Sequence, residues 1–146
     1  MFLIDPAFEA GSEAIAELPL CHVRLQRDAR FPWLILAPRR EGARELEDLS
    51  GADRAALIEE CILAGQAVRA IGETLGQPVD KLNIGALGNV TPQLHVHVLG
   101  RRRDDPAWPG PAWGFGHARD YDAGALVHAR EAVRRVLGDG GKVSLG

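Results

Sequence analysis

The sequence predicts an α+β fold in which a mainly antiparallel β-sheet packs against one long helix and a C-terminal helix. Three observations support this prediction. Polar and apolar residues alternate strictly from Gln93 to Val98, which is typical of a half-buried strand. Apolar residues recur at helical spacing between positions 52 and 75. Short turns join the predicted strands, so neighbouring strands are expected to run antiparallel.

The size and composition of the chain predict one cytoplasmic domain. Its 146 residues suit a single core, so we treat 1–146 as one domain. The net charge of −3 gives no general attraction to nucleic acid, and any anion site must be local. Cys21 and Cys61 form no CxxC pattern, which is typical of a reduced cytosolic protein. The sequence shows neither a signal peptide nor a membrane-spanning segment, so no membrane partner is expected.

The first third of the chain predicts a short helix followed by a β-hairpin. Asp5 and Pro6 are suited to start a helix, and Gly11 limits its length. Polar and apolar residues alternate in 21–27, and 33–37 is continuously apolar, as expected of a central strand. Residues 28–30 form a short turn between these two strands.

The middle of the chain predicts the long helix. A short helical turn at 44–49 precedes Ser50, which is a good N-cap with Asp53 three residues further on. The helix is expected from 52 to 75, where Gly76 closes it. Cys61 lies on its apolar stripe, so its expected role is core packing.

The last part of the chain predicts a second hairpin and a final helix. Strand 81–87 and the glycine-containing turn 88–92 lead into the alternating strand, which Gly100 is expected to end. The charge run Arg101–Asp105 predicts a solvated loop for most of its residues, although one of the arginines could face the site. Two tryptophans in the proline-rich stretch 106–114 are expected to cover apolar surface, beside a nucleotide base or a second subunit. The final helix is expected at 123–137, capped by Asp122, with a frayed end at 138–146.

The alternating strand also carries the candidate functional residues. Side chains two apart on a strand point the same way, so Gln93, His95 and His97 are expected to form one polar stripe. Two imidazoles near a cluster of arginines suggest chemistry on an anion. His-x-His can also bind a metal ion, although a catalytic zinc needs a third protein ligand. These residues alone leave catalysis, metal binding and a structural role open.

The segment from Gly88 to Leu99 resembles the signature of the histidine triad (HIT) family, His-φ-His-φ-His-φ-φ, where φ is hydrophobic. Gln93 stands in place of the first His, His95 matches the central His, and His97 matches the third. Upstream, Trp33–Arg39 resembles the family's H-x-L-V-x-P-K/R strand, with Trp33 in place of its His. The resemblance covers about residues 21–113.

This resemblance implies a HIT-like fold and a hydrolase or nucleotidyl transferase that uses no metal and no cofactor. The substrate would be a dinucleoside polyphosphate or a nucleoside phosphoramidate, attacked at its α-phosphate to give a nucleotidyl-histidine. His95 would be the nucleophile, His97 would contact the phosphate or the leaving group, and Gln93 would orient the site. The resemblance further implies substrate binding by Asn83, Asn89, Asp28, Trp33, Gly88 and Thr91.

The resemblance also implies a homodimer, because HIT proteins commonly pair. Two other functions are kept as alternatives. The loss of one triad His could leave a non-catalytic, nucleotide-binding regulatory module. The His-x-His pair could instead serve a metal-binding protein.

Overall fold

The computed structural model describes residues 1–138 and confirms the α+β prediction. The expected frayed end, beyond Gly138, lies outside the described residues. In chain order the elements are the 3-10 helix η1 (Pro6–Ala10), the strands β1 (Ser12–Glu17), β2 (Cys21–Gln26) and β3 (Trp33–Pro38), the 3-10 helix η2 (Leu46–Asp48), the helix α1 (Gly51–Thr74), the strands β4 (Lys81–Gly85) and β5 (Val96–Arg101), and the helix α2 (Ala123–Leu137).

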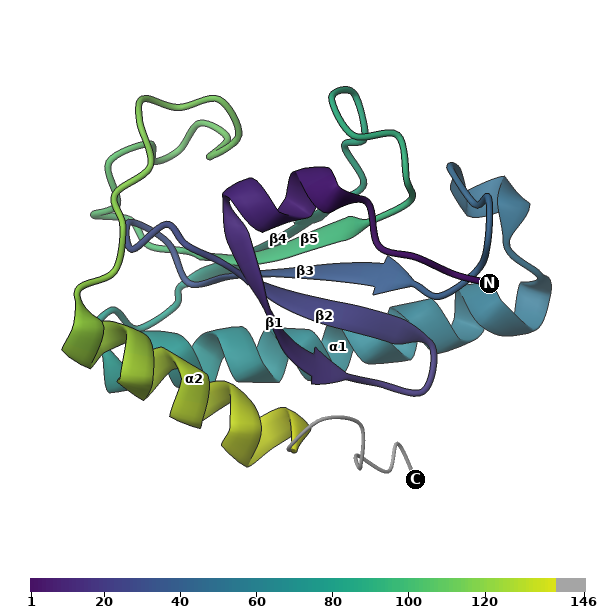
Figure 1. Cartoon of the computed structure of the whole chain (residues 1–146). Coiled ribbons are helices and arrows are strands. Elements are labelled where there is room, and N and C mark those ends of the chain that lie inside the picture. Colours follow the sequence, from purple (N-terminus) through teal and green to yellow (C-terminus); the bar gives the residue numbers. More distant parts are fainter. Residues whose placement is uncertain (139–146) are drawn as a thin grey trace.

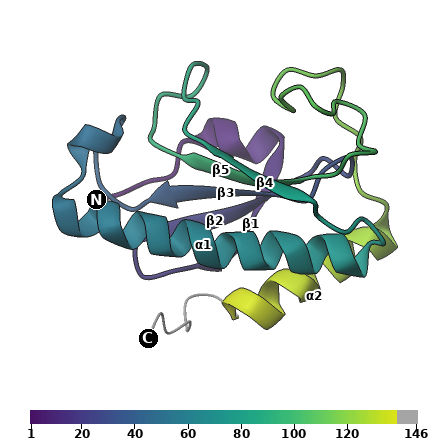
Figure 2. The ribbon, with the colours of Figure 1, turned by 180° about the vertical axis from the view of Figure 1, so that it is seen from behind.

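The five strands form one antiparallel sheet in the order β1-β2-β3-β5-β4, and both α-helices lie on the same face of it (Figures 1 and 2). Ser50 caps α1 as predicted, because its side chain accepts a hydrogen bond from the Asp53 N–H. Cys61 is buried in the core between α1 and the sheet. Burial and the neighbouring Glu60 raise the pKa of the Cys61 thiol to about 11, so this thiol is unsuited to nucleophilic chemistry. Neither α-helix in the described part of the chain has a stretch long and apolar enough to cross a membrane.

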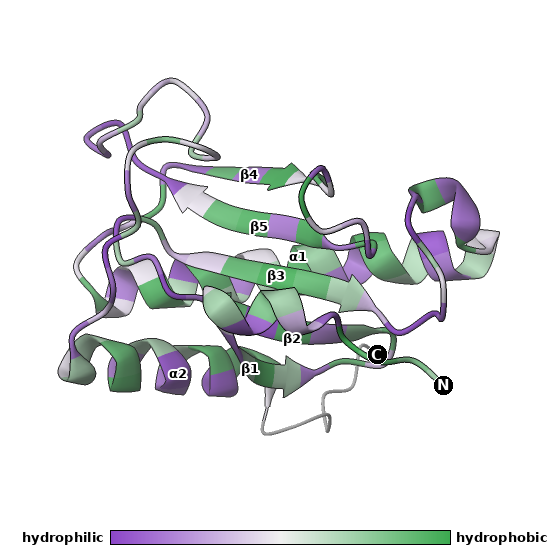
Figure 3. Ribbon diagram, turned by 45° about the horizontal axis from the view of Figure 1, so that its top comes forward, coloured by the Kyte–Doolittle hydropathy of each residue, from purple (hydrophilic) through white to green (hydrophobic). Residues whose placement is uncertain are grey.

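The opposite face of the sheet is covered by η1 and by the long loop between β5 and α2 (Figure 1). In Figure 3 the strand β3, at the centre of the sheet, is hydrophobic along most of its length. A second, smaller apolar cluster lies on this face and consists of Phe8, Phe31, Trp33, Ile35, Leu99, Ala107 and Ala112. η1 and the β5–α2 loop therefore form a third layer with its own apolar core. The candidate site lies between this layer and the sheet.

Three elements differ from the sequence prediction. Strand β1 was missed, because no element was predicted between Gly11 and the strand that begins at Cys21; β1 pairs with β2 at the edge of the sheet. Strand β4 ends at Gly85, two residues earlier than expected. Strand β5 runs through Gly100 instead of ending there. A Cβ at Gly100 would lie 2.5 Å from Val79 Cγ2, so glycine is needed here for close packing and not for a turn.

Arg101 is buried in β5, so the predicted solvated loop was wrong at this residue. Its guanidinium donates to both carboxylate oxygens of Asp105, at 2.8 and 3.0 Å, and both side chains are almost fully buried. It also donates to Asn83 Oδ1 at 3.0 Å. This network joins β4, β5 and the start of the long loop, and so fixes the edge of the sheet beside the site.

Candidate active site

His95 lies immediately before β5 and is held as a nucleophile would need to be. Its Nδ1 lies 2.7 Å from the backbone carbonyl oxygen of Gln93. A carbonyl oxygen can only accept, so Nδ1 must carry the proton that is donated. In the neutral ring the free lone pair is then on Nε2. The Phe8 ring meets the imidazole edge to face, with centroids 4.8 Å apart, and His95 is only 5% exposed. The orientation of this ring is therefore fixed from two sides.

His97 is held in the opposite tautomer. The Trp33 indole nitrogen donates to His97 Nδ1 at 3.0 Å. An indole N–H is a donor only, so Nδ1 accepts and the proton of the neutral ring is on Nε2. Burial, together with the neighbouring His95, lowers the pKa of His97 to about 4. His97 is therefore a neutral hydrogen-bond donor at physiological pH.

The two imidazoles form a complementary pair. Their ring centroids are 5.0 Å apart and their planes meet at 72°. One ring has a free lone pair on Nε2, and the other has an N–H at the same position. Such a pair can attack an electrophilic phosphorus and donate a hydrogen bond to one of its oxygens. No group of three His, Cys, Asp or Glu side chains within residues 1–138 is placed to hold a metal ion.

Two cavities meet at His95. The larger, of about 380 Å³, lies between η1, the sheet and the β4–β5 loop. It is lined by Ala7, Phe8, Gly11, Ser12, Gln26, Ile35, Leu87, Asn89, Val90, Thr91, His95, His97 and Trp113. This volume is in the range of about 300–1,000 Å³ usual for small-molecule sites. Apolar walls with a few polar groups suit a flat, partly polar ligand such as a nucleoside.

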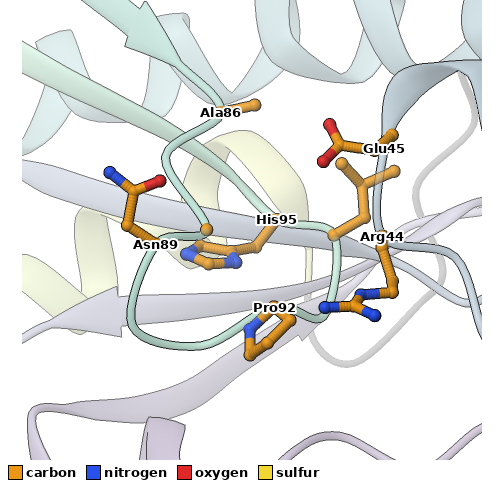
Figure 4. A pocket seen from close by; sticks show the side chains of 8 residues that line it. Arg44, Glu45, Ala86, Asn89, Pro92 and His95 are labelled. Atoms are coloured by element: carbon orange, nitrogen blue, oxygen red, sulfur yellow. The ribbon is translucent and has the colours of Figure 1, made fainter.

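The smaller cavity, of about 150 Å³, lies between the loop that precedes η2 and the β4–β5 loop (Figure 4). It is lined by Arg44, Glu45, Ala86, Gly88, Asn89, Pro92, Leu94 and His95. Asn89 and His95 line both cavities, so these two residues stand where a ligand would pass from one cavity into the other. Gly88 keeps the loop tight, since a Cβ there would lie 3.1 Å from the Thr91 carbonyl oxygen.

The side chain of Gln93, which was expected to orient the site, lines neither cavity at His95. Strand β5 starts only at Val96, so strand alternation does not extend back to Gln93. The amide instead holds the N-terminal segment. Its Nε2 donates to the Leu3 carbonyl oxygen and its Oε1 accepts from the Asp5 N–H, both at 2.8 Å. The hydrogen bond of Gln93 to His95 is made by its backbone carbonyl oxygen.

Two residues that were predicted to bind substrate, Asp28 and Asn83, do not line the cavities at His95. Asp28 is 2% exposed, and its carboxylate accepts hydrogen bonds from Arg30 at 2.8 and 3.0 Å. It lines neither cavity at His95, because the turn folds this carboxylate back onto its own arginine. Asn83 lines neither of them either, and its amide oxygen accepts from Arg101. Of the other predicted residues, Asn89, Thr91 and Gly88 line the cavities, and Trp33 acts through His97.

Several residues at the site were missed by sequence reasoning. Phe8, Gln26, Ile35 and Trp113 line the larger cavity, and Arg44 lines the smaller one. The Trp113 ring lies 5.7 Å from the His97 ring between centroids, and its indole N–H is buried without a hydrogen-bond partner among the described residues. The only sequence signal was that Trp113 was expected near a nucleotide base. The other four come from separate segments, with no local pattern that marks them.

The low pKa of His97 predicts a pH-dependent stability. The unfolded chain binds a proton at His97 below about pH 6.5, whereas the folded protein binds it only near pH 4. The unfolded state therefore binds more protons in this range, and the free energy of unfolding should decrease as the pH falls, by up to roughly 3 kcal/mol. In urea unfolding at pH 7 and pH 4.5, His97→Gln should lose less stability than the wild type. An equal loss in both proteins would contradict a buried, neutral His97.

Comparison with known proteins gives consistent matches. A model of the HIT domain matches residues 7–104, and so includes β1 and all of η1 except Pro6. Similar solved structures are a histidine triad (HIT) protein from Sinorhizobium meliloti 1021 (39% identity, TM-score 0.83, covering 94% of this chain and 98% of that one) and a histidine triad protein from Bradyrhizobium japonicum (39%, 0.82, 93% and 98%). A histidine triad protein from Marinobacter aquaeolei VT8 is 34% identical, with a TM-score of 0.81 and coverage of 94% and 96%. A search of curated proteins found no match.

Proposed function

Because the chain belongs to the histidine triad (HIT) family, a family of nucleotide-binding hydrolases and transferases, we propose that it cleaves nucleoside phosphate conjugates at the α-phosphate. The observation that carries this proposal is the pair of opposite tautomers. His95 presents a lone pair and His97 presents an N–H at one end of a cavity of nucleoside size.

The reaction would proceed in two displacements. His95 Nε2 attacks the α-phosphorus, the N–P bond forms, and the bond to the leaving group breaks with its electron pair. The Gln93 carbonyl stabilises the positive charge that develops on the ring, through the Nδ1–H bond. Water then attacks the phosphorus, the N–P bond breaks with its electron pair returning to Nε2, and one proton of the water is released to solvent. His97 Nε2–H and the Asn89 amide would donate to the phosphoryl oxygens during both steps.

The larger cavity would hold the nucleoside. Phe8 and Ile35 provide apolar walls for the base, and the Gln26 amide lies at the same cavity for the ribose hydroxyls. Gln26 would thus take a substrate-binding role that the resemblance implied for Asp28. The unpartnered indole N–H of Trp113 is a further donor for the ligand.

The proposal is tested by mixing the protein with adenosine 5′-phosphoramidates and diadenosine polyphosphates in excess EDTA and measuring released nucleotide. Release is expected in EDTA, because every step above uses protein groups alone. Binding without release would favour the non-catalytic module. Loss of release on chelation, restored by one metal, would favour a metal-dependent protein.

We also propose that the protein is a cytoplasmic homodimer that pairs through α1 and β4. Trp113 packs against His97 at the site, whereas Ile58 and Ile62 on α1 and Ile84 on β4 are all more than half exposed. Strand β4 is an edge of the sheet and packs against α1, since Gly65 lies against Leu82. An edge strand with apolar neighbours suits pairing with a second copy.

Replacing Ile62 with lysine should therefore shift the protein from dimer to monomer. A charge at the centre of this surface would be desolvated without a partner in the dimer. Sedimentation equilibrium at micromolar concentration measures the mass, and Val90→Lys, at an exposed apolar residue on another loop, is the matched control. A dimeric Ile62→Lys variant would place the interface elsewhere.

A further inference from the structure

We infer that the smaller cavity is a subsite for a phosphate leaving group, with Arg44 as the residue that selects it. The inference rests on the proposed function and narrows it, since substrates cleaved at a phosphoanhydride bond would be preferred over phosphoramidates. The two cavities share Asn89 and His95. A nucleoside in the larger cavity, with its α-phosphate at His95, would extend its next group into the smaller one.

The backbone fixes Arg44 next to the nucleophile. The Leu94 N–H, next to His95, donates to the carbonyl oxygen of Ala43, next to Arg44, at 3.0 Å. The N–H groups of Arg44 and Glu45 donate to the Asp48 carboxylate at 3.0 and 2.9 Å. The loop that carries Arg44 is thus tied to the start of β5 on one side and to η2 on the other.

The guanidinium of Arg44 has hydrogen-bonding capacity to spare. Within residues 1–138 it donates no hydrogen bond and makes no close ion pair, and its charge acts on the protein only by helping to lower the pKa of Asp48. In Figure 4 it extends beside Pro92 at the wall of the cavity that contains His95. A guanidinium matches the geometry of phosphate oxygens and can bind them through two parallel hydrogen bonds.

The size and chemistry of the cavity favour phosphate over a larger group. At about 150 Å³ it is below the usual range for a drug-sized or nucleoside ligand. Glu45 is the only acidic lining residue, and it would weaken the attraction for an anion without cancelling it. Gly88 lets a ligand approach the backbone of the β4–β5 loop.

The need of the leaving group for a proton also favours a phosphoanhydride substrate. When a phosphoanhydride is cleaved, the α-phosphorus–oxygen bond breaks and the electron pair leaves on the oxygen of a phosphate, which is stable without a proton. An amine leaving group needs a proton as it departs. His97 is a poor source of that proton, since burial keeps its ring neutral down to a pKa of about 4. The site is therefore better suited to a leaving group that departs as an anion.

The test compares two substrates in four proteins. The substrates are diadenosine triphosphate and an adenosine phosphoramidate with an uncharged amine. Arg44→Gln should lower kcat/KM for the triphosphate by about 10- to 100-fold, the effect of losing a charge-assisted hydrogen-bonded contact, and change the phosphoramidate value less than threefold. Glu45→Gln should raise kcat/KM for the triphosphate only. The matched control is Arg103→Gln, which removes an exposed arginine whose guanidinium makes no hydrogen bond among the described residues; it should change neither value.

The outcomes distinguish a failure of the Arg44 subsite from a failure of the proposed hydrolase function. An equal loss on both substrates with Arg44→Gln, or no loss on either, would overturn the subsite. A wild type that releases nucleotide from neither substrate would instead refute the proposed function. Binding of inorganic tripolyphosphate, measured by calorimetry, tests the subsite without turnover. The wild type should bind it at least about tenfold more tightly than Arg44→Gln, and equal binding would overturn the inference.

Discussion

Replacing His95 with alanine should lower turnover at least about 10⁴-fold, as expected when a covalent nucleophile is removed. In the proposed mechanism the N–P bond of the intermediate forms at His95 Nε2, and the neighbouring His97 is not able to replace it. His97 has its proton on Nε2 because Trp33 occupies its Nδ1, so it presents no lone pair to the phosphorus. Single-turnover rates with a nucleoside phosphate conjugate measure the effect.

The control for His95→Ala is a measurement of whether the variant still folds. The His95 ring contacts Phe8, so a small loss of stability is expected on truncation, and urea unfolding should still show a cooperative transition. His97→Ala should slow the reaction less than His95→Ala, because it removes a hydrogen-bond donor and not the bond-forming atom. If folded His95→Ala protein retains turnover within about tenfold of wild type, the two-step mechanism is wrong.

Replacing Gln93 with glutamate should raise KM by about 10- to 100-fold, with a smaller effect on kcat. The amide donates to the Leu3 carbonyl and accepts from the Asp5 N–H. A carboxylate cannot donate to Leu3, and it would repel both that carbonyl and the nearby Asp5 carboxylate. The N-terminal segment would then release Phe8, which lines the larger cavity.

Two further variants separate this role from general damage. Gln93→His should retain most of the activity, because neutral imidazole also offers one donor and one acceptor. Phe8→Ala should reproduce the rise in KM. Hydrogen exchange of residues 1–11 should increase in Gln93→Glu and remain near wild type in Gln93→His. Unchanged exchange and unchanged KM in Gln93→Glu would show that Gln93 does not position the N-terminal segment.

The helices and most strands could be predicted because their signals are local. Ser50 caps α1, and the alternation around His97 matches the strand that carries it. Alternation is not sufficient to locate the start of a strand. The polar–apolar pattern continues back through Gln93, while the backbone has already left the sheet, and the pattern gave no sign that the Gln93 amide binds the N-terminal segment.

The cavities could not be predicted because they are made by segments far apart in the chain. Phe8, Arg44 and Trp113 reach His95 or His97 from three separate loops or short helices. The position of Asp28 depended on a partner two residues away, Arg30, which competes for its carboxylate. Such competition between a ligand role and an ion pair is decided by the turn geometry, which residue identity alone does not determine.

The central claim is that His95 Nε2 carries the nucleotidyl group between the two steps. Rapid mixing of excess protein with an adenosine 5′-phosphate conjugate, followed by quenching and peptide mass spectrometry, tests it most directly. The account predicts an adenylyl adduct on the peptide that contains His95, linked at Nε2, present in EDTA and absent from His95→Ala. Turnover with no adduct at any time, or an adduct on His97, would contradict it.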